Sequence, residues 1–88
     1  MNEMYLYQLN QVKTKVNDMI KNNRIITLIP GDNTYDPCIF YCREGVFYTY
    51  SPNIGLLPRP DFTKTMILEH FIEMLKEGGN FYESGYVD

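Results

Sequence analysis

The sequence predicts a single α+β domain, built from an N-terminal helix, a three-stranded antiparallel meander, a C-terminal helix and a short tail. Three observations support this class. Apolar residues near both ends of the chain recur at helical spacing, whereas the middle holds three short runs of β-branched and aromatic residues. Clusters of glycine, proline and asparagine separate those runs. Because 88 residues suffice for one core, we assign residues 1–88 to one domain.

The first element is expected to be a helix over residues 3–22. Asn2 is a candidate N-cap, and Glu3 places an acid in the first turn, where the helix dipole favours it. Asn22 and Asn23 suit the left-handed conformation that ends many helices. The face predicted to be buried has the 4-3-4-3 spacing of one helical stripe, and it consists of Tyr5, Leu9, Val12, Val16 and Met19.

Three strands are expected to follow the helix. Residues 24–29 form a β-branched, apolar run that ends at the turn-forming sequence of residues 30–33. Residues 38–42 and 46–50 flank a three-residue connection whose glycine tolerates a positive φ, which predicts a hairpin. The strands are apolar on both sides, so either both sheet faces are covered or one face presents tyrosines to a partner.

The remaining third of the chain is expected to hold a loop, a helix and a tail. Residues 51–60 contain three prolines and a glycine, which predicts a loop draped over the core rather than a strand. Asp61 or Thr63 is expected to cap a helix that continues to Glu77 and ends at a glycine pair. Residues 80–88 have aromatics without a clear period, so we expect them to pack back on the domain or to become ordered on a partner.

Charge and composition narrow the class of function. The net charge is −3, and residues 65–88 carry five carboxylates against one lysine, so direct binding to nucleic acid is not expected. No stretch approaches the ~20 apolar residues of a membrane span, and the first residues lack a secretory signature. Cys38 and Cys42 would lie about 13 Å apart on one strand, too far for a disulfide. We therefore expect a cytoplasmic protein with reduced thiols and no membrane contact.

No residue pattern predicts catalysis, a metal site or a cofactor. His70 is the single histidine, and a nucleophile–base pair would require Cys38 or Cys42 to meet it together with a third, orienting group. These three side chains also fall short of the four ligands that a structural zinc site requires. No glycine-rich phosphate loop is present. We therefore expect a protein that is not an enzyme.

Two sets of residues are candidates for binding a partner. The predicted hairpin carries aromatic side chains, and tyrosine is enriched at protein interfaces, although half-buried strand tyrosines explain this pattern as well. The turn, the last helix and the tail carry carboxylates, which suit a basic partner, although a solvated helix face also explains them. The candidate residues are Tyr41, Tyr48, Tyr50, Glu44, Glu69, Glu73 and Glu83.

One stretch resembles a known family. The segment 67–80, ILEHFIEMLKEGGN, and the helix–three strands–helix order resemble small phage anti-CRISPR proteins. Those proteins inhibit a CRISPR nuclease by occupying its site for duplex DNA. The resemblance implies that Glu44, in the turn REGV, and Glu83, after the helix, contact the nuclease. The dense acidic cluster that the family carries after this helix is reduced here to Glu83.

We therefore expect a small non-enzymatic inhibitor or adaptor that binds a larger protein effector through acidic and tyrosine-rich surfaces. The resemblance implies a phage anti-defence role. One alternative is a module that sequesters a small molecule or nucleotide in a pocket between the tyrosines and the loop 51–60. Another is a homo-oligomeric structural protein, such as a homodimer, whose sheet face is the interface between copies.

Overall fold

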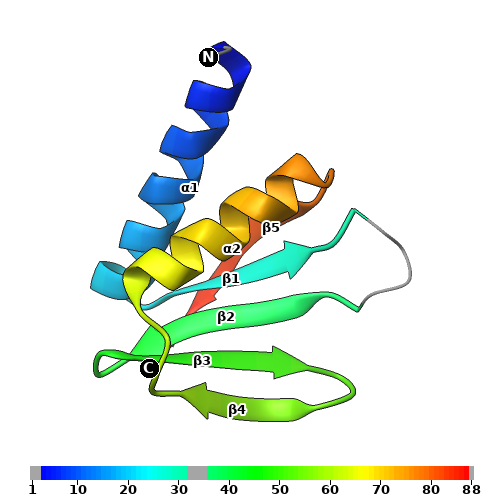
Figure 1. Ribbon diagram of the computed structural model, residues 1–88. Coiled ribbons are helices and arrows are strands. Elements are labelled where there is room, and N and C mark those ends of the chain that lie inside the picture. Colours follow the sequence, from blue (N-terminus) through cyan, green and yellow to red (C-terminus); the bar gives the residue numbers. More distant parts are fainter. Residues whose placement is uncertain (1–2, 32–35, 88) are drawn as a thin grey trace.

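The protein is an α+β fold of two helices and one five-stranded antiparallel sheet (Figure 1). The computed structural model describes residues 3–31 and 36–87. The sheet has the strand order β4-β3-β2-β1-β5. In chain order the elements are α1 (Glu3–Asn22), β1 (Arg24–Ile29), β2 (Cys38–Arg43), β3 (Val46–Ser51), β4 (Gly55–Arg59), α2 (Lys64–Lys76) and β5 (Asn80–Tyr86).

The α+β class is confirmed, but the predicted three-stranded sheet is wrong because two further strands extend it. The segment 51–60, predicted as a loop, contains β4, which pairs with β3 along the sheet edge. Pro58 lies opposite Tyr48 in this pairing. A proline lacks the N–H needed in a central strand, but an edge strand needs hydrogen bonds on one side only. The prolines therefore mark an edge strand and do not exclude a strand.

The second additional strand, β5, is formed by the tail. It pairs antiparallel with β1, so that Thr27 lies opposite Tyr82 and Leu28 opposite Phe81. Its residues alternate between half-buried and exposed, as expected for an edge strand with one covered face. This alternation is not visible in the sequence, because the adjacent residues Phe81 and Tyr82 are both aromatic although they lie on opposite faces of the strand. The tail is thus ordered on the domain itself, on the opposite edge from β4.

The helix α1 has the bounds predicted from the sequence. Val12, Val16 and Met19 are completely buried, and Glu3 and Lys21 lie in the first and last turns. Asn23 follows the helix with φ 59, the left-handed conformation that an asparagine tolerates. The candidate N-cap, Asn2, and the side chain of Tyr5 lie outside the described part of the chain. The helical stripe is confirmed where it is described.

The hairpin between β2 and β3 is tighter than predicted. Arg43 pairs directly with Val46, so the turn consists of two residues rather than three. Glu44 and Gly45 have φ values of 53 and 80, and two consecutive positive φ values are typical of a type I′ turn. This turn matches the twist of the flanking strands, which places the tyrosines of β2 and β3 in register.

The helix α2 begins after Thr63 rather than Asp61. The Thr63 hydroxyl accepts a hydrogen bond of 3.2 Å from the backbone N–H of Met66, which satisfies one donor of the first turn. The helix ends at Lys76, and Gly78 follows with φ 86. The N–H of Gly79 then donates to the Met74 carbonyl at 2.8 Å. The predicted glycine stop is confirmed.

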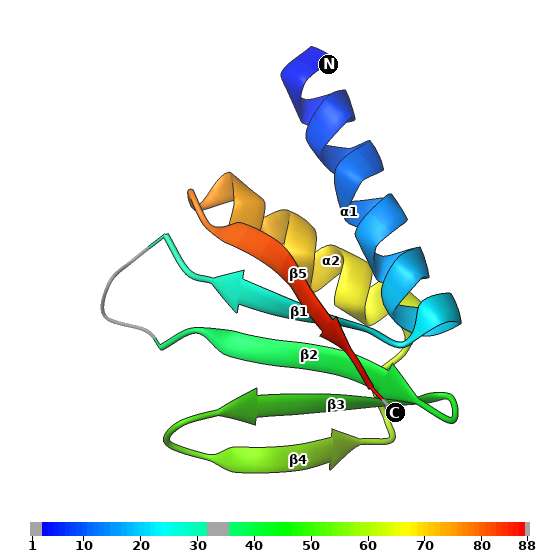
Figure 2. The same cartoon turned by 180° about the vertical axis from the view of Figure 1, so that it is seen from behind.

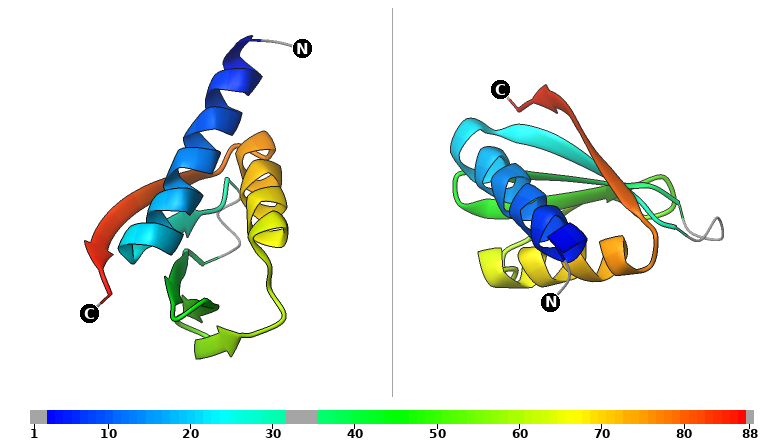
Figure 3. Two further views of the ribbon diagram at one scale, coloured as in Figure 1. Left: turned by 90° about the vertical axis from the view of Figure 1, so that its left-hand side faces the viewer. Right: turned by 90° about the horizontal axis from the view of Figure 1, so that it is seen from above.

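Both helices lie on the same face of the sheet, which we call the covered face (Figure 3). The core contains Val12, Val16 and Met19 from α1 and Ile67 and Phe71 from α2. These side chains pack on alternate residues of three strands, which are Ile26, Leu28, Phe40, Cys42 and Phe47. Because only one parity of each strand is buried, one face receives the core.

Neither of the two described helices lies in front of the opposite face of the sheet (Figure 2). We call it the open face. The sequence left open whether both faces of the sheet are covered. In the structure the helices cover one face only, although the strands are apolar on both sides.

No helix in the described ranges 3–31 and 36–87 has the length and apolar character needed to cross a membrane.

Candidate functional site

The open face carries a row of side chains that crosses all five strands. Tyr50 lies opposite Leu56 of β4 on one side and Ile39 of β2 on the other. Ile39 pairs with Thr27, which in turn pairs with Tyr82 of β5. Directly opposite residues have Cβ atoms about 5 Å apart, close enough for neighbouring side chains to touch. The row is therefore continuous across the sheet and, apart from Thr27, consists of apolar and aromatic residues.

A second row contains the two remaining predicted tyrosines. The rings of Tyr41 and Tyr48 have centroids 5.0 Å apart and planes 10° apart, so they are stacked. Pro58 lies opposite Tyr48 on the neighbouring strand. Stacking and a rigid proline leave these side chains few conformations. Little further ordering is then needed when a partner covers them.

The open face is almost free of charge. Taking the open-face parity of each strand, its described residues include one charged side chain, Arg43, and no carboxylate. Tyr50, Leu56 and Tyr82 remain 41%, 54% and 54% exposed, respectively. A contiguous exposed apolar band with few charges is typical of a surface that another molecule covers. The three predicted tyrosines therefore share one face, which is the candidate site.

The predicted glutamates do not join that site. Glu69 and Glu73 are exposed on α2, which lies over the covered face. Glu73 also pairs with Lys76 at 3.5 Å on the helix surface. Glu44 is exposed at the β2–β3 turn, at one end of the sheet. The structure thus separates the tyrosines from the carboxylates of α2, which the sequence could not do.

Glu83 lies in a small ionic cluster on the covered face. Its carboxylate contacts Lys15 of α1 at 3.2 Å and Arg24 of β1 at 3.0 Å. Arg24 also lies over the ring of Tyr86, 4.7 Å from its centroid. Asp18 of α1 interacts with the same three side chains, so the cluster holds two cations and two carboxylates, and its contacts fasten α1 and β5 to β1. A stabilising role explains Glu83 directly, because half-buried pairs of this kind join elements distant in sequence.

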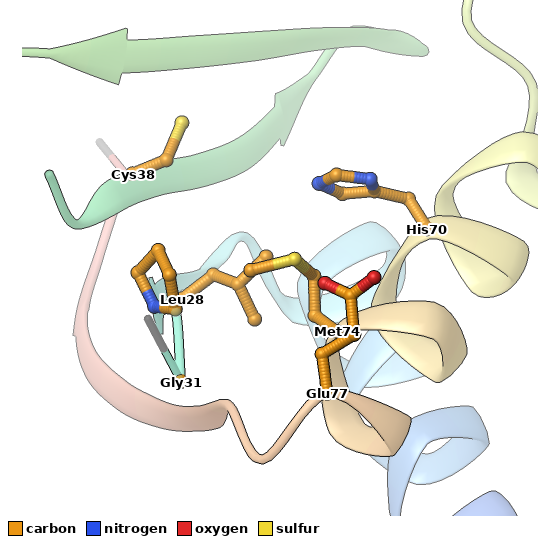
Figure 4. A pocket seen from close by; sticks show the side chains of 7 residues that line it. Leu28, Gly31, Cys38, His70, Met74 and Glu77 are labelled. Atoms are coloured by element: carbon orange, nitrogen blue, oxygen red, sulfur yellow. The ribbon is translucent and has the colours of Figure 1, made fainter. Parts of the chain in front are cut away.

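Two adjacent pockets lie between α2 and the covered face. The first has a volume of about 670 Å³ and lies beside Leu28, Met74 and Glu77 (Figure 4). The second, of about 340 Å³, extends toward Arg59 and Phe62. A pocket was predicted between the tyrosines and residues 51–60, but those residues include β4 and the tyrosines face away. The pockets lie on the opposite side of the sheet.

Cys38 and His70 line both pockets, and no spacing in the sequence predicts that they meet there. Figure 4 shows Cys38 on β2 and His70 on α2 facing the same space, with Glu77 below the imidazole. The hydrogen bonds among the described residues do not join the thiol to the imidazole. The Cys38 sulfur is instead 3.9 Å from the Ile39 carbonyl oxygen. The imidazole packs 5.8 Å from the ring of Phe40.

The electrostatics of this pair oppose nucleophilic activation. Burial raises the pKa of the Cys38 thiol, against smaller contributions from a backbone hydrogen bond and from Arg59. Burial lowers the pKa of the His70 imidazole, and Glu77 opposes that shift only in part. A catalytic thiolate–imidazolium pair requires the reverse, a lowered pKa of the thiol and a raised pKa of the imidazole. Both groups are therefore neutral at pH 7. No cluster of three or more potential metal ligands occurs in the described ranges.

The thiols are expected to react slowly. In the native protein at pH 7, Cys38 and Cys42 should react with iodoacetamide more slowly than the same thiols in 8 M urea, because both have a raised pKa and Cys42 is buried. Mass spectrometry of peptides after timed quenching measures each rate, and His70→Gln should leave both unchanged. Rapid alkylation of Cys38 that His70→Gln abolishes would contradict this expectation and indicate an activated pair.

Comparisons with protein-family models, with curated proteins and with solved structures each find no match.

Proposed function

We propose that this protein is a small non-enzymatic binding protein, an inhibitor or adaptor, that docks on a larger protein through the open face of its sheet. One observation carries the proposal. The face opposite the helices presents Tyr41, Tyr48 and Tyr50 with apolar neighbours and without a carboxylate, in a chain whose net charge is −3. Acids are thus confined to other surfaces of the described structure.

The composition of this face resembles the centre of a protein interface. Tyrosine combines a large apolar area with few rotatable bonds, so covering it costs little conformational entropy. Interface cores are depleted in charged residues and enriched in aromatic ones. The absence of carboxylates removes the desolvation cost that buried, unpaired acids would impose on binding. Tyr50 is the expected anchor because it is exposed and has apolar neighbours on both sides, Leu56 and Ile39.

The resemblance to anti-CRISPR proteins suggests one class of partner, a nuclease whose DNA site is basic. In that case Glu69 and Glu73, together with Glu44, would supply the negative charge. Complementary charge accelerates encounter, and its contribution falls as salt increases. Glu83 is unsuited to this role, since its carboxylate is already paired with Lys15 and Arg24. The variant Glu83→Lys would also place three cations together and weaken the fold.

The proposal is tested by capture of the partner from the native host with three matched variants. Tyr50→Lys alters the open face. Tyr7→Lys alters an aromatic residue of α1 that is 61% exposed, and Glu69→Lys alters the acidic surface of α2. We expect Tyr50→Lys to reduce affinity for the captured protein about 30-fold or more, as at interface hot spots, and Tyr7→Lys to leave it unchanged. Affinity is measured with the purified partner by calorimetry.

Other modes of binding would give different results with the same variants. If Tyr50→Lys and Tyr7→Lys bind the partner equally, the open face is not the docking surface and the proposal fails. Loss of binding in Glu69→Lys, with a steep salt dependence, would instead place the interface on α2. Light scattering at several concentrations distinguishes the homodimer, since that alternative requires a dimer that Tyr50→Lys dissociates.

A further inference from the structure

The pocket that extends toward Arg59 is a second candidate site, independent of the open face. Its volume, about 340 Å³, lies within the range of small-molecule sites. Pro30 and Gly31 of the neighbouring pocket adjoin residues 32–35, which the structure does not describe, so we consider only the Arg59 pocket. Its floor is apolar and buried, and its rim comes from β4, the segment after it and α2. The lining residues are Cys38, Phe40, Thr49, Arg59, Phe62, Met66, Ile67 and His70.

Arg59 is the charged residue in this lining. Its Nε donates a hydrogen bond of 3.1 Å to the hydroxyl of Thr49, a residue that is only 7% exposed. Its guanidinium carbon lies 5.5 Å from the centroid of the Phe62 ring. These two contacts hold the side chain in place at the pocket wall. Among the residues that the structure describes, no carboxylate pairs with it, and its terminal nitrogens have no hydrogen-bond partner.

The other polar groups of the pocket are neutral. Burial lowers the pKa of His70 and raises the pKa of Cys38, which leaves both uncharged at pH 7. The pocket is therefore an apolar space with one fixed positive charge. A guanidinium with free N–H groups binds carboxylates strongly, because it can donate two parallel hydrogen bonds.

We propose that the pocket formed by Arg59, Phe62, Met66 and His70 binds a small organic monocarboxylate with an apolar body. The body lies against Phe40 and Ile67, and the carboxylate pairs with Arg59. A dianion is disfavoured, since the pocket offers a single cation. A nucleotide is disfavoured for the same reason, because its phosphates require several donors or a bound cation. Arg59 thus sets the specificity of the site.

The experiment uses two probes that differ only in charge. 1-Naphthaleneacetate carries one carboxylate on an aromatic body, and 1-naphthaleneacetamide replaces that carboxylate with a neutral amide. Binding is followed by NMR of the methionine methyl groups in protein labelled at those positions. Met66 lines the pocket, whereas Met19 is buried in the core between α1 and the sheet and serves as an internal control. A ligand of this size is expected to bind with a Kd of about a millimolar.

We expect the acid to shift the Met66 methyl resonance, to leave Met19 unchanged and to bind about tenfold more tightly than the amide. Arg59→Gln should remove that preference, because the glutamine retains the length of the side chain but not the charge. Arg43→Gln, on the open face, should retain the preference for the acid. Because the two variants change the net charge equally, this control distinguishes a direct ion pair with Arg59 from a general effect of the net charge of the protein. The amide should still bind Arg59→Gln, since the apolar floor remains.

Three results would overturn the proposal. The first is that the Met66 methyl resonance does not shift at about 5–10 mM probe, which is about 5–10 times the expected dissociation constant. The second is equal affinity for the acid and the amide. The third is a preference for the acid that survives in Arg59→Gln. The Met19 resonance verifies in each variant that the core is intact. These results are independent of the open face, so either proposal can fail without the other.

Discussion

Replacing Phe71 with alanine is expected to cost about 4 kcal/mol of the free energy of unfolding. Phe71 is fully buried in the core, where its ring centroid lies 5.2 Å from that of Phe40 and 5.9 Å from that of Phe81. It therefore joins α2 to β2 and to β5 at one point. Truncation to alanine loses the favourable transfer free energy of the ring. It also leaves a cavity, because α2, β2 and β5 cannot all move inward to fill the space.

This loss is a large part of the total stability. Small domains have a free energy of unfolding at the lower end of about 5–15 kcal/mol, so Phe71→Ala should fold only marginally. The melting temperature is expected to fall by roughly 15–30 °C. Urea denaturation and thermal melting by circular dichroism measure both quantities. Tyr82→Ala, at an aromatic residue of β5 that is 54% exposed, is the matched control and should cost less than about 1 kcal/mol. Similar losses in the two variants would show that Phe71 is not central.

Replacing Gly79 with alanine is expected to cost about 2–3 kcal/mol, because its added methyl group has no space. A Cβ at this position would lie 2.8 Å from the Met74 carbonyl oxygen and 2.9 Å from that of Ile29. Both neighbours are backbone atoms, at the end of α2 and the end of β1. Relief of the clash must therefore move the helix away from the strand. The hydrogen bond from the Gly79 N–H to the Met74 carbonyl would be lost as well.

Gly85 provides the control for this prediction. Gly85 lies in β5, the strand that begins directly after Gly79, and a Cβ there would meet only the Ile25 side chain at 4.0 Å. Neither Gly79 nor Gly85 has a left-handed φ, so the two substitutions differ in packing and not in backbone strain. Gly85→Ala should be neutral or stabilise the protein by up to about 1 kcal/mol, since alanine restricts the unfolded chain. Chemical denaturation compares the two variants, and equal stabilities would refute the proposed close approach.

Local patterns predicted the elements whose signals lie within one segment. The helical stripe of α1, the strands β1 to β3, the hairpin glycine and the glycine stop of α2 all follow from neighbouring residues. The two strands that were missed are the sheet edges. In β4 the prolines hid the strand, and in β5 consecutive aromatic residues hid the alternation. Both depend on pairing with β3 or β1, which no local pattern reports.

The candidate sites were predictable to different degrees. Tyr41, Tyr48 and Tyr50 were predicted together because a hairpin places alternate residues of two strands on one face. Glu83 was predicted as an exposed acid, whereas β5 places it between Lys15 and Arg24. The Arg59 pocket was missed entirely, since its lining combines three strands, the segment after β4 and α2. No spacing in the sequence identifies a site assembled in this way.

The sequence by itself determined the α+β class, the bounds of α1 and the limit of one histidine and two cysteines, because these depend on residue identity and short-range periodicity. Only the tertiary structure decided which sheet face is open, where the carboxylates lie, and that Cys38 and His70 share a pocket. The physical reason is that both helices bury their stripes on one face of the sheet. The second helix, which packs on this face through Ile67 and Phe71, borders the pockets on that side, and the tyrosines remain on the other.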